Sequence, residues 1–312
     1  MYNDLKRELE EILQEGMLKE AEPMRLHTTF RIGGPARFYV MPKKEEELTA
    51  LIKLCNRKEI PFFILGNGSN LLVGDYGFDG VVIEVKEHFS YMKFQDIKME
   101  ENGKLVSVTA GAGIMLVKLA REAANRSLQG FEFAAGIPGT LGGAVAMNAG
   151  AYGGEIKDHI VRAKVLTKEG DVLELTKEEL ELGYRRSIVT KKKYIVLEAE
   201  FEFTHGDKET ILETIKDFNG RRRDKQPLEY PSAGSTFKRP EGYFAGKLIQ
   251  DAGLRGFRIG DLMVSEKHCG FVVNVGNGTA AQAKELIEKV METVEAQFGV
   301  TLEPEVRMIG KF

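Results

Sequence analysis

The sequence predicts an α+β protein of about two domains. The chain has 312 residues, against a typical ~150 residues per domain. Segments with apolar residues at helical spacing are interspersed with short apolar or alternating runs that are typical of strands. The alternating pattern breaks at Thr204–Asp207, after which a new helical pattern begins. We therefore expect a domain boundary at this break.

The first half of the chain predicts helices and strands in mixed order. Apolar runs at 62–65, 81–83 and 105–110 predict strands, and residues 115–124 predict a helix. The glycine-dense stretch 136–154 predicts mostly loop with one short helix. Two earlier amphipathic helices are indicated by apolar residues at helical spacing: Leu5, Leu9, Ile12 and Leu13, then Leu48, Leu51, Ile52 and Cys55.

The second half predicts a hairpin, a long strand and two long helices. The hairpin comprises 160–167 and 172–175, and alternation over 195–203 predicts a half-buried strand. Period-two alternation predicts a final strand over 302–308. A helix is predicted from Lys208, because four apolar residues recur at helical spacing on one face: Ile211, Leu212, Ile215 and Phe218. A capping box at Thr279–Gln282 opens a helix whose predicted inward face is Ala283, Leu286, Ile287, Val290, Met291, Val294 and Phe298.

Composition excludes several classes of protein. Forty-four basic and 47 acidic residues give a net charge of −3, so no global field favours nucleic acid or anionic lipid. The start of the chain is charged, and no run approaches the ~18 apolar residues of a membrane span. Cys55 and Cys269 are too far apart in the sequence to have metal-ligand spacing. We expect each to be a small buried hydrophobic side chain in a reducing compartment. We expect a cytoplasmic protein with no metal site.

Glycine is over-represented and clustered, with 34 residues against a typical ~7% of a chain. The loop Gly66–Asn70 directly follows an apolar strand, and its backbone N–H groups could converge on an anion. A tight turn between two strands is the alternative. The loop is not a dinucleotide-binding fingerprint, because Leu71–Val73 is apolar where that motif requires a helix.

The second glycine loop, Gly136–Glu155, contains mostly small residues. Bare backbone suits a large planar or phosphorylated ligand that lies directly against the chain. A tightly packed glycine corner is the alternative. Two such loops would fit the pyrophosphate of a dinucleotide.

Three later segments carry chemical groups: Tyr184–Ser187, Ser232–Lys238 and Leu302–Arg307. A hydroxyl, an arginine and a carboxylate could together protonate a carbon and stabilise an enolate. Their spacing does not show that they meet. The basic run Arg221–Arg223 is also explained by cations that complement a helix dipole.

Taken in order, these motifs resemble those of the UDP-N-acetylenolpyruvoylglucosamine reductase family. The resemblance runs from about Thr28 to Ile309 and includes Thr29–Ala36 and Gly66–Val73. It implies an FAD-binding fold of the p-cresol methylhydroxylase type with two subdomains, and a C-terminal α+β substrate-binding domain. The implied bounds are 1–78 (with the N-terminal helix), 79–205 and 206–312.

The resemblance also implies the chemistry. NADPH reduces non-covalently bound FAD, and the enolpyruvyl ether of the UDP-sugar then receives hydride from flavin N5 at C3 and a proton at C2. Ser235 would donate the proton, while Arg185 and Glu305 would polarise the carboxylate and stabilise the enol. Substrate contacts are implied for Tyr184, Lys225, Arg239 and Arg307. Cofactor contacts are implied for Gly66, Asn67, Gly68, Ser69, Asn70, Gly136, Ile137, Pro138, Gly139, Thr140, Gly142, Gly143, Asn148 and Gly150.

The chain departs from the family pattern in places. Arg239 stands where some members have asparagine, Arg186 adjoins Arg185, and the insertion that carries a substrate-binding tyrosine in longer members is missing after Ser187. An oxygen-using flavin oxidase of the same fold is one alternative, although the first loop lacks the histidine that tethers FAD in several oxidases. A non-catalytic nucleotide-sugar binding module is another. We expect a monomer.

Overall fold

A computed structural model describes residues 2–98 and 104–312. The chain divides into two compact units, each made of separate stretches of sequence. The first unit comprises Met1–Lys19, Tyr39–Asn67 and Val81–Arg222, and the second comprises Glu20–Phe38, Gly68–Gly80 and Arg223–Phe312. These divisions differ from 1–78, 79–205 and 206–312, because the chain passes between the units several times; the three-part division stays a prediction. Within the described ranges, no helix is long and apolar enough to cross a membrane.

The first unit is built on an antiparallel sheet in the order β11-β10-β12-β7-β6. The predicted hairpin and long strand are confirmed. The ring of Phe131 packs against those of Phe133, Phe201 and Phe203 with centroids 5.2–5.4 Å apart, which fills the core on one side of β12. The strands are β6 (Met92–Lys98), β7 (Lys104–Gly111), β10 (Ile160–Leu166), β11 (Val172–Thr176) and β12 (Ile195–Thr204).

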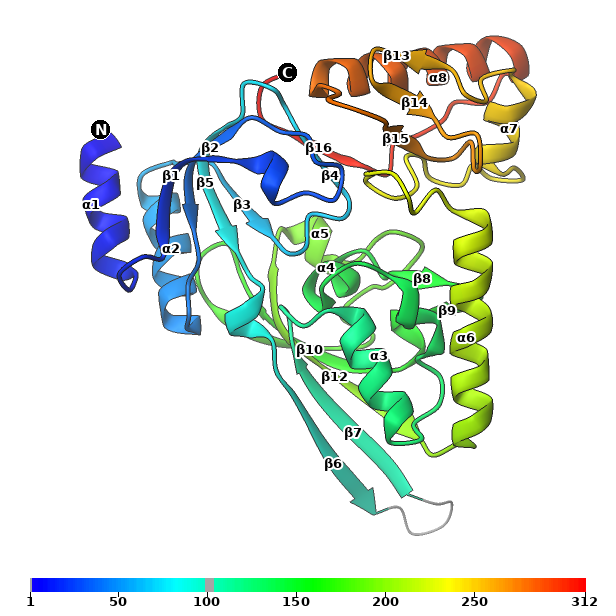
Figure 1. The fold of residues 1–312 in the computed structure, drawn as a ribbon. Helices are drawn as coiled ribbons and strands as arrows, with labels where there is room; N and C mark the ends of the chain where they lie inside the picture. Colours follow the sequence, from blue (N-terminus) through cyan, green and yellow to red (C-terminus); the bar gives the residue numbers. More distant parts are fainter. Residues whose placement is uncertain (1, 99–103) are drawn as a thin grey trace. The chain divides into compact units, whose positions relative to one another are not determined.

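Helices α3 and α4 lie beside this sheet, whereas α1 and α2 lie beside strands β1, β2 and β5 (Figure 1). The helix predicted from Leu48, Leu51, Ile52 and Cys55 and the helix predicted over 115–124 are confirmed as α2 and α3, and α4 is the short helix expected inside the glycine-dense stretch. Helix α4 packs on β12 and β7 and contacts α5, while α1 contacts α2. The helices are α1 (Tyr2–Ile12), α2 (Glu45–Arg57), α3 (Leu116–Asn125), α4 (Leu141–Ala146), α5 (Ile188–Lys192) and α6 (Lys208–Lys225), with 3-10 turns at Met24–Leu26, Glu87–Phe89, Glu132–Gly136 and Ile156–Asp158.

A second sheet, in the order β1-β2-β5-β3, leads into the first glycine loop. Strand β3 (Phe62–Leu65) pairs in parallel with β5 (Phe78–Glu84), and the chain leaves β3 directly at Gly66. Strands β1 (Leu18–Pro23) and β2 (Pro35–Val40) were not predicted; in β1, half of the residues are charged and half are exposed, so no apolar pattern marks it. The short strands β8 (Gly150–Ala151) and β9 (Gly154–Glu155) pair inside the second glycine loop.

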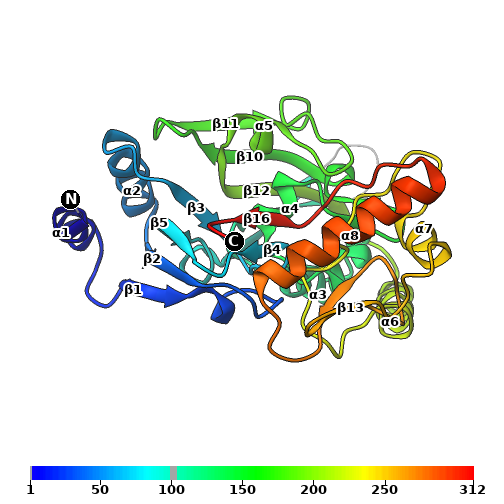
Figure 2. The ribbon, with the colours of Figure 1, turned by 90° about the horizontal axis from the view of Figure 1, so that it is seen from above.

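The second unit has its own hydrophobic core beneath α8 (Ala280–Phe298). Helix α8 packs against α7 (Ala245–Asp251) and against the sheet β13-β14-β15 (Figure 2). Both hydrogen bonds of the predicted capping box are present at Thr279 and Gln282. The remaining strands are β4 (Leu71–Val73), β13 (Arg258–Ile259), β14 (Leu262–Val264), β15 (Val272–Asn274) and β16 (Arg307–Ile309), of which β16 pairs in parallel with β4.

Two predictions for this unit were wrong. The final strand covers only Arg307–Ile309 instead of 302–308, since Pro304 has no N–H to donate to a ladder and forms only an isolated bridge with Phe237. Phe298 was expected inside, but it lies in the last turn of α8 and is 40% exposed. Cys55 and Cys269 are both free and buried, as predicted.

Candidate functional site

The two glycine loops contact each other within the first unit. Asn67 Nδ2 donates a hydrogen bond to the carbonyl of Pro138 over 2.7 Å. A Cβ at Gly66 would overlap the buried hydroxyl of Thr140. Gly66 is therefore glycine because Thr140 approaches it. This contact involves Gly66 and Asn67, while Gly68–Asn70 belong to the second unit.

The second loop combines close packing with open backbone. Gly142 and Gly150 are packed, because an added Cβ would lie 3.1 Å from Ala112 and 2.7 Å from the carbonyl of Gly154. At Gly143, by contrast, an added Cβ would meet only Thr140 among the described residues, at 3.9 Å. Ile137, Pro138 and Gly139 join the 3-10 turn that ends at Gly136 to α4. A loop with open backbone of this kind fits a planar, phosphate-bearing cofactor such as FAD.

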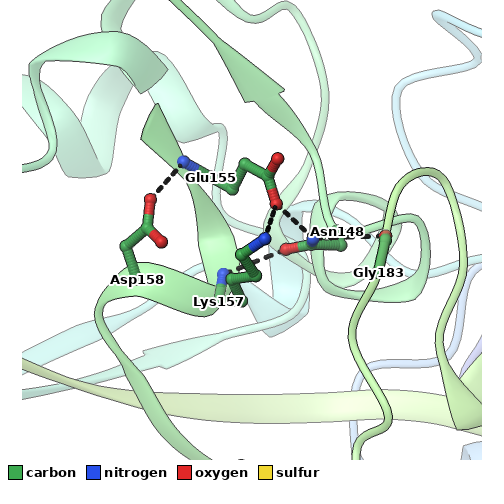
Figure 3. Close-up of polar contacts among 5 residues, drawn as sticks. All are labelled: Asn148, Glu155, Lys157, Asp158 and Gly183. Carbon is green, nitrogen blue, oxygen red and sulfur yellow. Dashed lines mark hydrogen bonds and ion pairs between the residues drawn. The ribbon is translucent and has the colours of Figure 1, made fainter. Parts of the chain in front are cut away.

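Asn148 braces the end of this loop against the segment that carries Arg185 (Figure 3). Its buried amide donates to Glu155 Oε2 over 2.8 Å and to the carbonyl of Gly183 over 3.2 Å, and its Oδ1 accepts from the backbone N–H of Lys157 over 2.9 Å. Both amide donors are thus used inside the protein. The backbone N–H of Asn148 donates to the carbonyl of Val145 over 3.2 Å, and the cofactor contact expected of Asn148 stays a prediction.

Glu155 is the charged residue in this set of contacts, since it accepts a hydrogen bond from Asn148 and pairs with Lys157. Its carboxylate lies 2.8 Å from Lys157 Nζ, and its backbone N–H donates to Asp158 over 2.8 Å. The hydrogen bond from Lys157 is the largest influence that lowers the pKa of Glu155, and Asn148 and the charge of Arg185 lower it further against the opposing effect of burial. Glu155 therefore stays ionised at neutral pH.

Tyr184 and Arg185 occupy the tip of a tight hairpin. The backbones of Gly183 and Arg186 exchange hydrogen bonds of 3.1 and 3.2 Å. Arg185 has a left-handed φ of +54°, a conformation that non-glycine residues adopt at an energetic cost. Its guanidinium lies 5.4 Å from the ring centroid of the half-exposed Tyr184. The hairpin thus presents both side chains from one turn.

The adjacent arginines have different surroundings. Arg185 Nε is buried in the hairpin, whereas Arg186 lines an open pocket of about 880 Å³ together with Lys157, Lys177 and Lys191. The two arginines therefore differ in their surroundings, and the assignment of Arg185 to the substrate stays a prediction.

In the second unit, the structure brings Ser235 close to Glu305. The backbone N–H of Glu305 donates to the carbonyl of Thr236 over 2.8 Å, and that of Lys238 donates to the carbonyl of Glu303 over 2.8 Å. Thr236 Oγ1 accepts from the N–H of Val272 over 2.9 Å. Ser235 is exposed, and its hydroxyl has no hydrogen bond among the residues that the structure describes.

The end of the first glycine loop joins this pair. Asn70 Nδ2 donates to the carbonyl of Glu305 over 3.1 Å, and the carbonyl of Asn70 accepts from the N–H of Arg307 over 3.0 Å. A Cβ at Gly234 would lie 3.8 Å from the carbonyl of Ser69. Loop residues and the predicted acid therefore form one cluster within this unit.

Lys225 and Arg239 lie at the surface of the second unit, whereas Gly68 is buried in it. Lys225 is the exposed last residue of α6. Arg239 is exposed, donates to the carbonyl of Tyr243 and places its guanidinium 4.1 Å from the Phe244 ring centroid. A Cβ at Gly68 would overlap the carbonyl of His27, and Gly68 has a φ of +62°. Arg185 belongs to the other unit, so its position over Ser235 stays a prediction.

Sequence reasoning missed two residues beside the loops. Glu155 was included only as the end of a glycine loop, and Arg222 was interpreted as a cation near a helix end. The sequence does carry a signal for Arg222: Asn219 and Phe218 precede it by three and four residues, the spacings that place side chains on one helix face.

Comparisons with known proteins agree with this geometry. A sequence profile described as an FAD binding domain matches residues 36–176, a range that contains both glycine loops. The profile of the UDP-N-acetylenolpyruvoylglucosamine reductase C-terminal domain matches residues 226–309, which contain Ser235 and Glu305.

Full-length relatives carry the same name. The chain is 56% identical over 311 residues to a UDP-N-acetylenolpyruvoylglucosamine reductase of Lachnoclostridium phytofermentans, covering 100% of this chain and 99% of that one. It is 54% identical over 308 residues to one of Agathobacter rectalis, covering 97% of each.

A solved structure extends the likeness to the fold. The UDP-N-acetylenolpyruvylglucosamine reductase of Thermus caldophilus superimposes with a TM-score of 0.77 at 34% identity, over 94% of this chain and 98% of that one. The predicted FAD-binding fold with a C-terminal α+β domain is confirmed. The chain belongs to the UDP-N-acetylenolpyruvoylglucosamine reductase family, whose members are FAD-dependent oxidoreductases.

Proposed function

We propose that this chain uses NADPH to reduce UDP-N-acetylglucosamine enolpyruvate to UDP-N-acetylmuramate in peptidoglycan precursor synthesis. Its likeness to named reductases over the whole chain supports this assignment. The observation that carries it is the exposed Ser235 hydroxyl, fixed by backbone bonds beside Glu305. In this proposal the chain acts as a cytoplasmic monomer, with FAD at 1–78 and 79–205 and the UDP-sugar at 206–312.

The glycine loops would hold FAD, which supplies a two-electron carrier that accepts hydride from NADPH and delivers it to C3 of the substrate. Gly66 and Asn67 lie against Pro138 and Thr140, and the open backbone at Gly143 leaves room for a flat ring system. Ser69 and Asn70 would contribute from the other end of the first loop. The remaining proposed contacts are Gly68, Gly136, Ile137, Gly139, Gly142, Asn148 and Gly150.

Ser235 would donate the proton that completes reduction at C2. A serine hydroxyl is a weak acid, so it can act only on a strongly basic carbon and from a fixed position. The backbone bonds between 236–238 and 303–305 support that fixed position. The hydroxyl of Ser235 is also available, since no described group accepts a hydrogen bond from it.

Arg185 and Glu305 would act on the substrate carboxylate and on the negative charge that develops at the enol. A cation aimed at developing charge stabilises the transition state more than the ground state. The hairpin that holds Arg185 supports this role, because Asn148 fixes Gly183. Tyr184, Lys225, Arg239 and Arg307 would contact the carboxylate or the diphosphate.

Anaerobic half-reactions test the proposal. The purified holoenzyme is expected to be yellow, to bleach on addition of NADPH and to regain its colour when UDP-N-acetylglucosamine enolpyruvate is added. Mass spectrometry of the product should then show a gain of two hydrogens. Colour that returns with oxygen but not with the enolpyruvyl sugar would instead indicate an oxidase. If neither restores the colour, the chain is a binding module.

A further inference from the structure

The second unit contains an open pocket of about 620 Å³ whose lining residues have no part in the proposed reduction. The loop 24–34 lines it with Arg25 and Arg31, and Tyr230 and the turn after β15 line the rest. Pockets that bind small molecules measure about 300–1,000 Å³. The pocket is therefore large enough to hold a ligand of its own.

The loop that carries both arginines is closed by its own hydrogen bonds. The N–H of Arg25 donates to the carbonyl of Gly33, and that of Arg31 donates to the carbonyl of Thr28, both over 3.2 Å. The buried Thr28 hydroxyl donates to the carbonyl of Ile32 over 3.1 Å. Arg31 has a left-handed φ of +56°, a costly conformation for a non-glycine residue that is often found at functional sites. The backbone thus fixes where both side chains leave the loop.

The pocket is positively charged. Arg25 and Arg31 line it, whereas no aspartate or glutamate among the described residues does. Neither guanidinium has an ion pair or a hydrogen bond with another described residue. The carboxylate of Asp261 lies beside the turn, where it accepts a hydrogen bond from the N–H of Asn277 over 2.8 Å. One carboxylate at the edge leaves an excess of positive charge inside.

The other walls of the pocket are apolar or already hydrogen-bonded. Leu26 is 66% exposed and Tyr230 is 42% exposed, so both can contact the apolar part of a ligand. The buried Asn274 accepts from the N–H of Gly276 over 3.2 Å and donates to the carbonyl of Phe30 over 3.4 Å. The two guanidiniums are therefore the charged donors that remain for a ligand.

We propose that this pocket binds a phosphate monoester that carries a ring. The phosphate lies at Arg25 and Arg31, because a guanidinium presents a planar fork of donors that matches phosphate oxygens. Two such groups suit a monoester, which carries nearly two negative charges at neutral pH. The ring lies against Leu26 and Tyr230. The inference rests neither on FAD nor on the proposed reduction of the UDP-sugar.

A ligand in this pocket joins two segments of the second unit. It contacts the loop 24–34 on one side and Pro231 on the other. The carbonyl of Ser232, the next residue, accepts a hydrogen bond from Thr29 Oγ1 over 2.7 Å. Because the ligand bridges segments that the fold brings together, its binding should raise the melting temperature of the holoenzyme.

Calorimetric titration of the holoenzyme with phenyl phosphate, inorganic phosphate and phenol tests the proposal. Phenyl phosphate should bind more tightly than either of its two parts. Arg25→Gln and Arg31→Gln should each weaken phenyl phosphate binding about 10-fold, as for the loss of charge-assisted hydrogen bonds at a solvent-exposed site. Tyr230→Ala should weaken phenyl phosphate binding and leave inorganic phosphate unaffected.

Three further variants locate the binding. Arg121→Gln removes an equal charge from an exposed position on α3 and should leave every affinity unchanged. Arg185→Gln removes the arginine proposed for the UDP-sugar and should also leave phenyl phosphate binding unchanged. Arg31→Asn suits the left-handed backbone and remains informative if Arg31→Gln does not fold by circular dichroism.

Several results would overturn the proposal. Wild-type protein that does not bind phenyl phosphate at millimolar concentration would reject the site outright. A loss with Arg185→Gln but none with Arg25→Gln or Arg31→Gln would place the phosphate in the proposed substrate site instead. Equal losses with Arg121→Gln and Arg31→Gln would show only a long-range charge effect. Inorganic phosphate that binds as tightly as phenyl phosphate would reject the contact with the ring. None of these readouts depends on turnover of the UDP-sugar.

Discussion

The two segments that carry the predicted catalytic groups are fixed in different ways. The hairpin Gly183–Arg186 depends on a side chain from elsewhere, because Asn148 holds the carbonyl of Gly183 and Glu155 holds Asn148. The segment Ser235–Lys238 is fixed mainly by backbone bonds to Glu303, Glu305 and Gly270. The position of Arg185 should therefore be sensitive to remote substitutions, and that of Ser235 should not.

Removal of the hydroxyl itself should have the largest effect. Ser235→Ala is expected to slow turnover by about 10²- to 10⁴-fold, the usual contribution of a positioned acid, while NADPH still reduces the flavin at the normal rate. Stopped-flow absorbance separates the two half-reactions. Ser235→Thr keeps a hydroxyl and should retain more activity. Equal slowing of both half-reactions by Ser235→Ala would remove Ser235 from the role of proton donor.

Removal of the Asn148 side chain should have the second-largest effect on turnover. Asn148→Ala frees the Gly183 carbonyl and leaves Glu155 without its amide partner, so we expect kcat to fall by about 10- to 100-fold as Arg185 loses its position. Unfolding free energy should also fall by about 1–3 kcal/mol, measured by urea denaturation. The exposed Asn125→Ala, at the end of α3, is the control. Loss of stability with an unchanged kcat would show that the brace does not act on Arg185.

The backbone-fixed segment should show the opposite behaviour. Thr236→Val leaves the buried N–H of Val272 without its acceptor, which should cost about 1–3 kcal/mol of unfolding free energy. Turnover should stay within a few-fold of wild type, because the backbone bonds to Glu305 and Gly270 remain. Urea denaturation and steady-state kinetics of the same variant check that stability falls while turnover is nearly unchanged. A loss of turnover as large as that of Asn148→Ala would erase the distinction between the two segments.

The smallest effect concerns the charge in the brace. Glu155→Gln keeps the shape but loses the ion pair with Lys157, which is worth about 0–1 kcal/mol for a partly exposed pair. The lowered pKa of Glu155 stabilises the fold above an unperturbed value of about 4.3. That advantage should fade as pH falls through the lower folded pKa. Thermal unfolding of both proteins between about pH 3 and pH 8 should therefore converge at the acid end; a gap that widens there would contradict the assignment.

The fold could be predicted where side-chain period and local chemistry agree. The capping box at Thr279 and the hairpin around Lys168–Asp171 combine a clear period with a clear boundary, and the helix at Glu45–Arg57 has a clear period. Strand β1 was missed because its charged residues do not alternate with apolar ones. The prediction of a strand from residue 302 was wrong. The residues there alternate as in a strand, but Pro304 cannot donate a backbone hydrogen bond, and the segment forms only an isolated bridge.

The site could be predicted only as separate motifs. Nothing in the sequence indicates that Glu305 pairs with Thr236, since that contact is made by backbone atoms far apart in the chain. The three hydrogen bonds of the Asn148 side chain could not be predicted either, because a single side-chain hydrogen bond produces no periodic pattern in the sequence. The resemblance identified the chemical groups, and the structure adds how each group is held within its own unit.

A double-mutant cycle tests most directly the central claim that the two segments act on one substrate. Arg185→Ala, Glu305→Gln and the double variant are compared by kcat/KM for the enolpyruvyl sugar. If both groups act on the same carboxylate, the double variant should lose at least ~1 kcal/mol less than the sum of the single losses. Losses that add within about 0.5 kcal/mol would contradict the account.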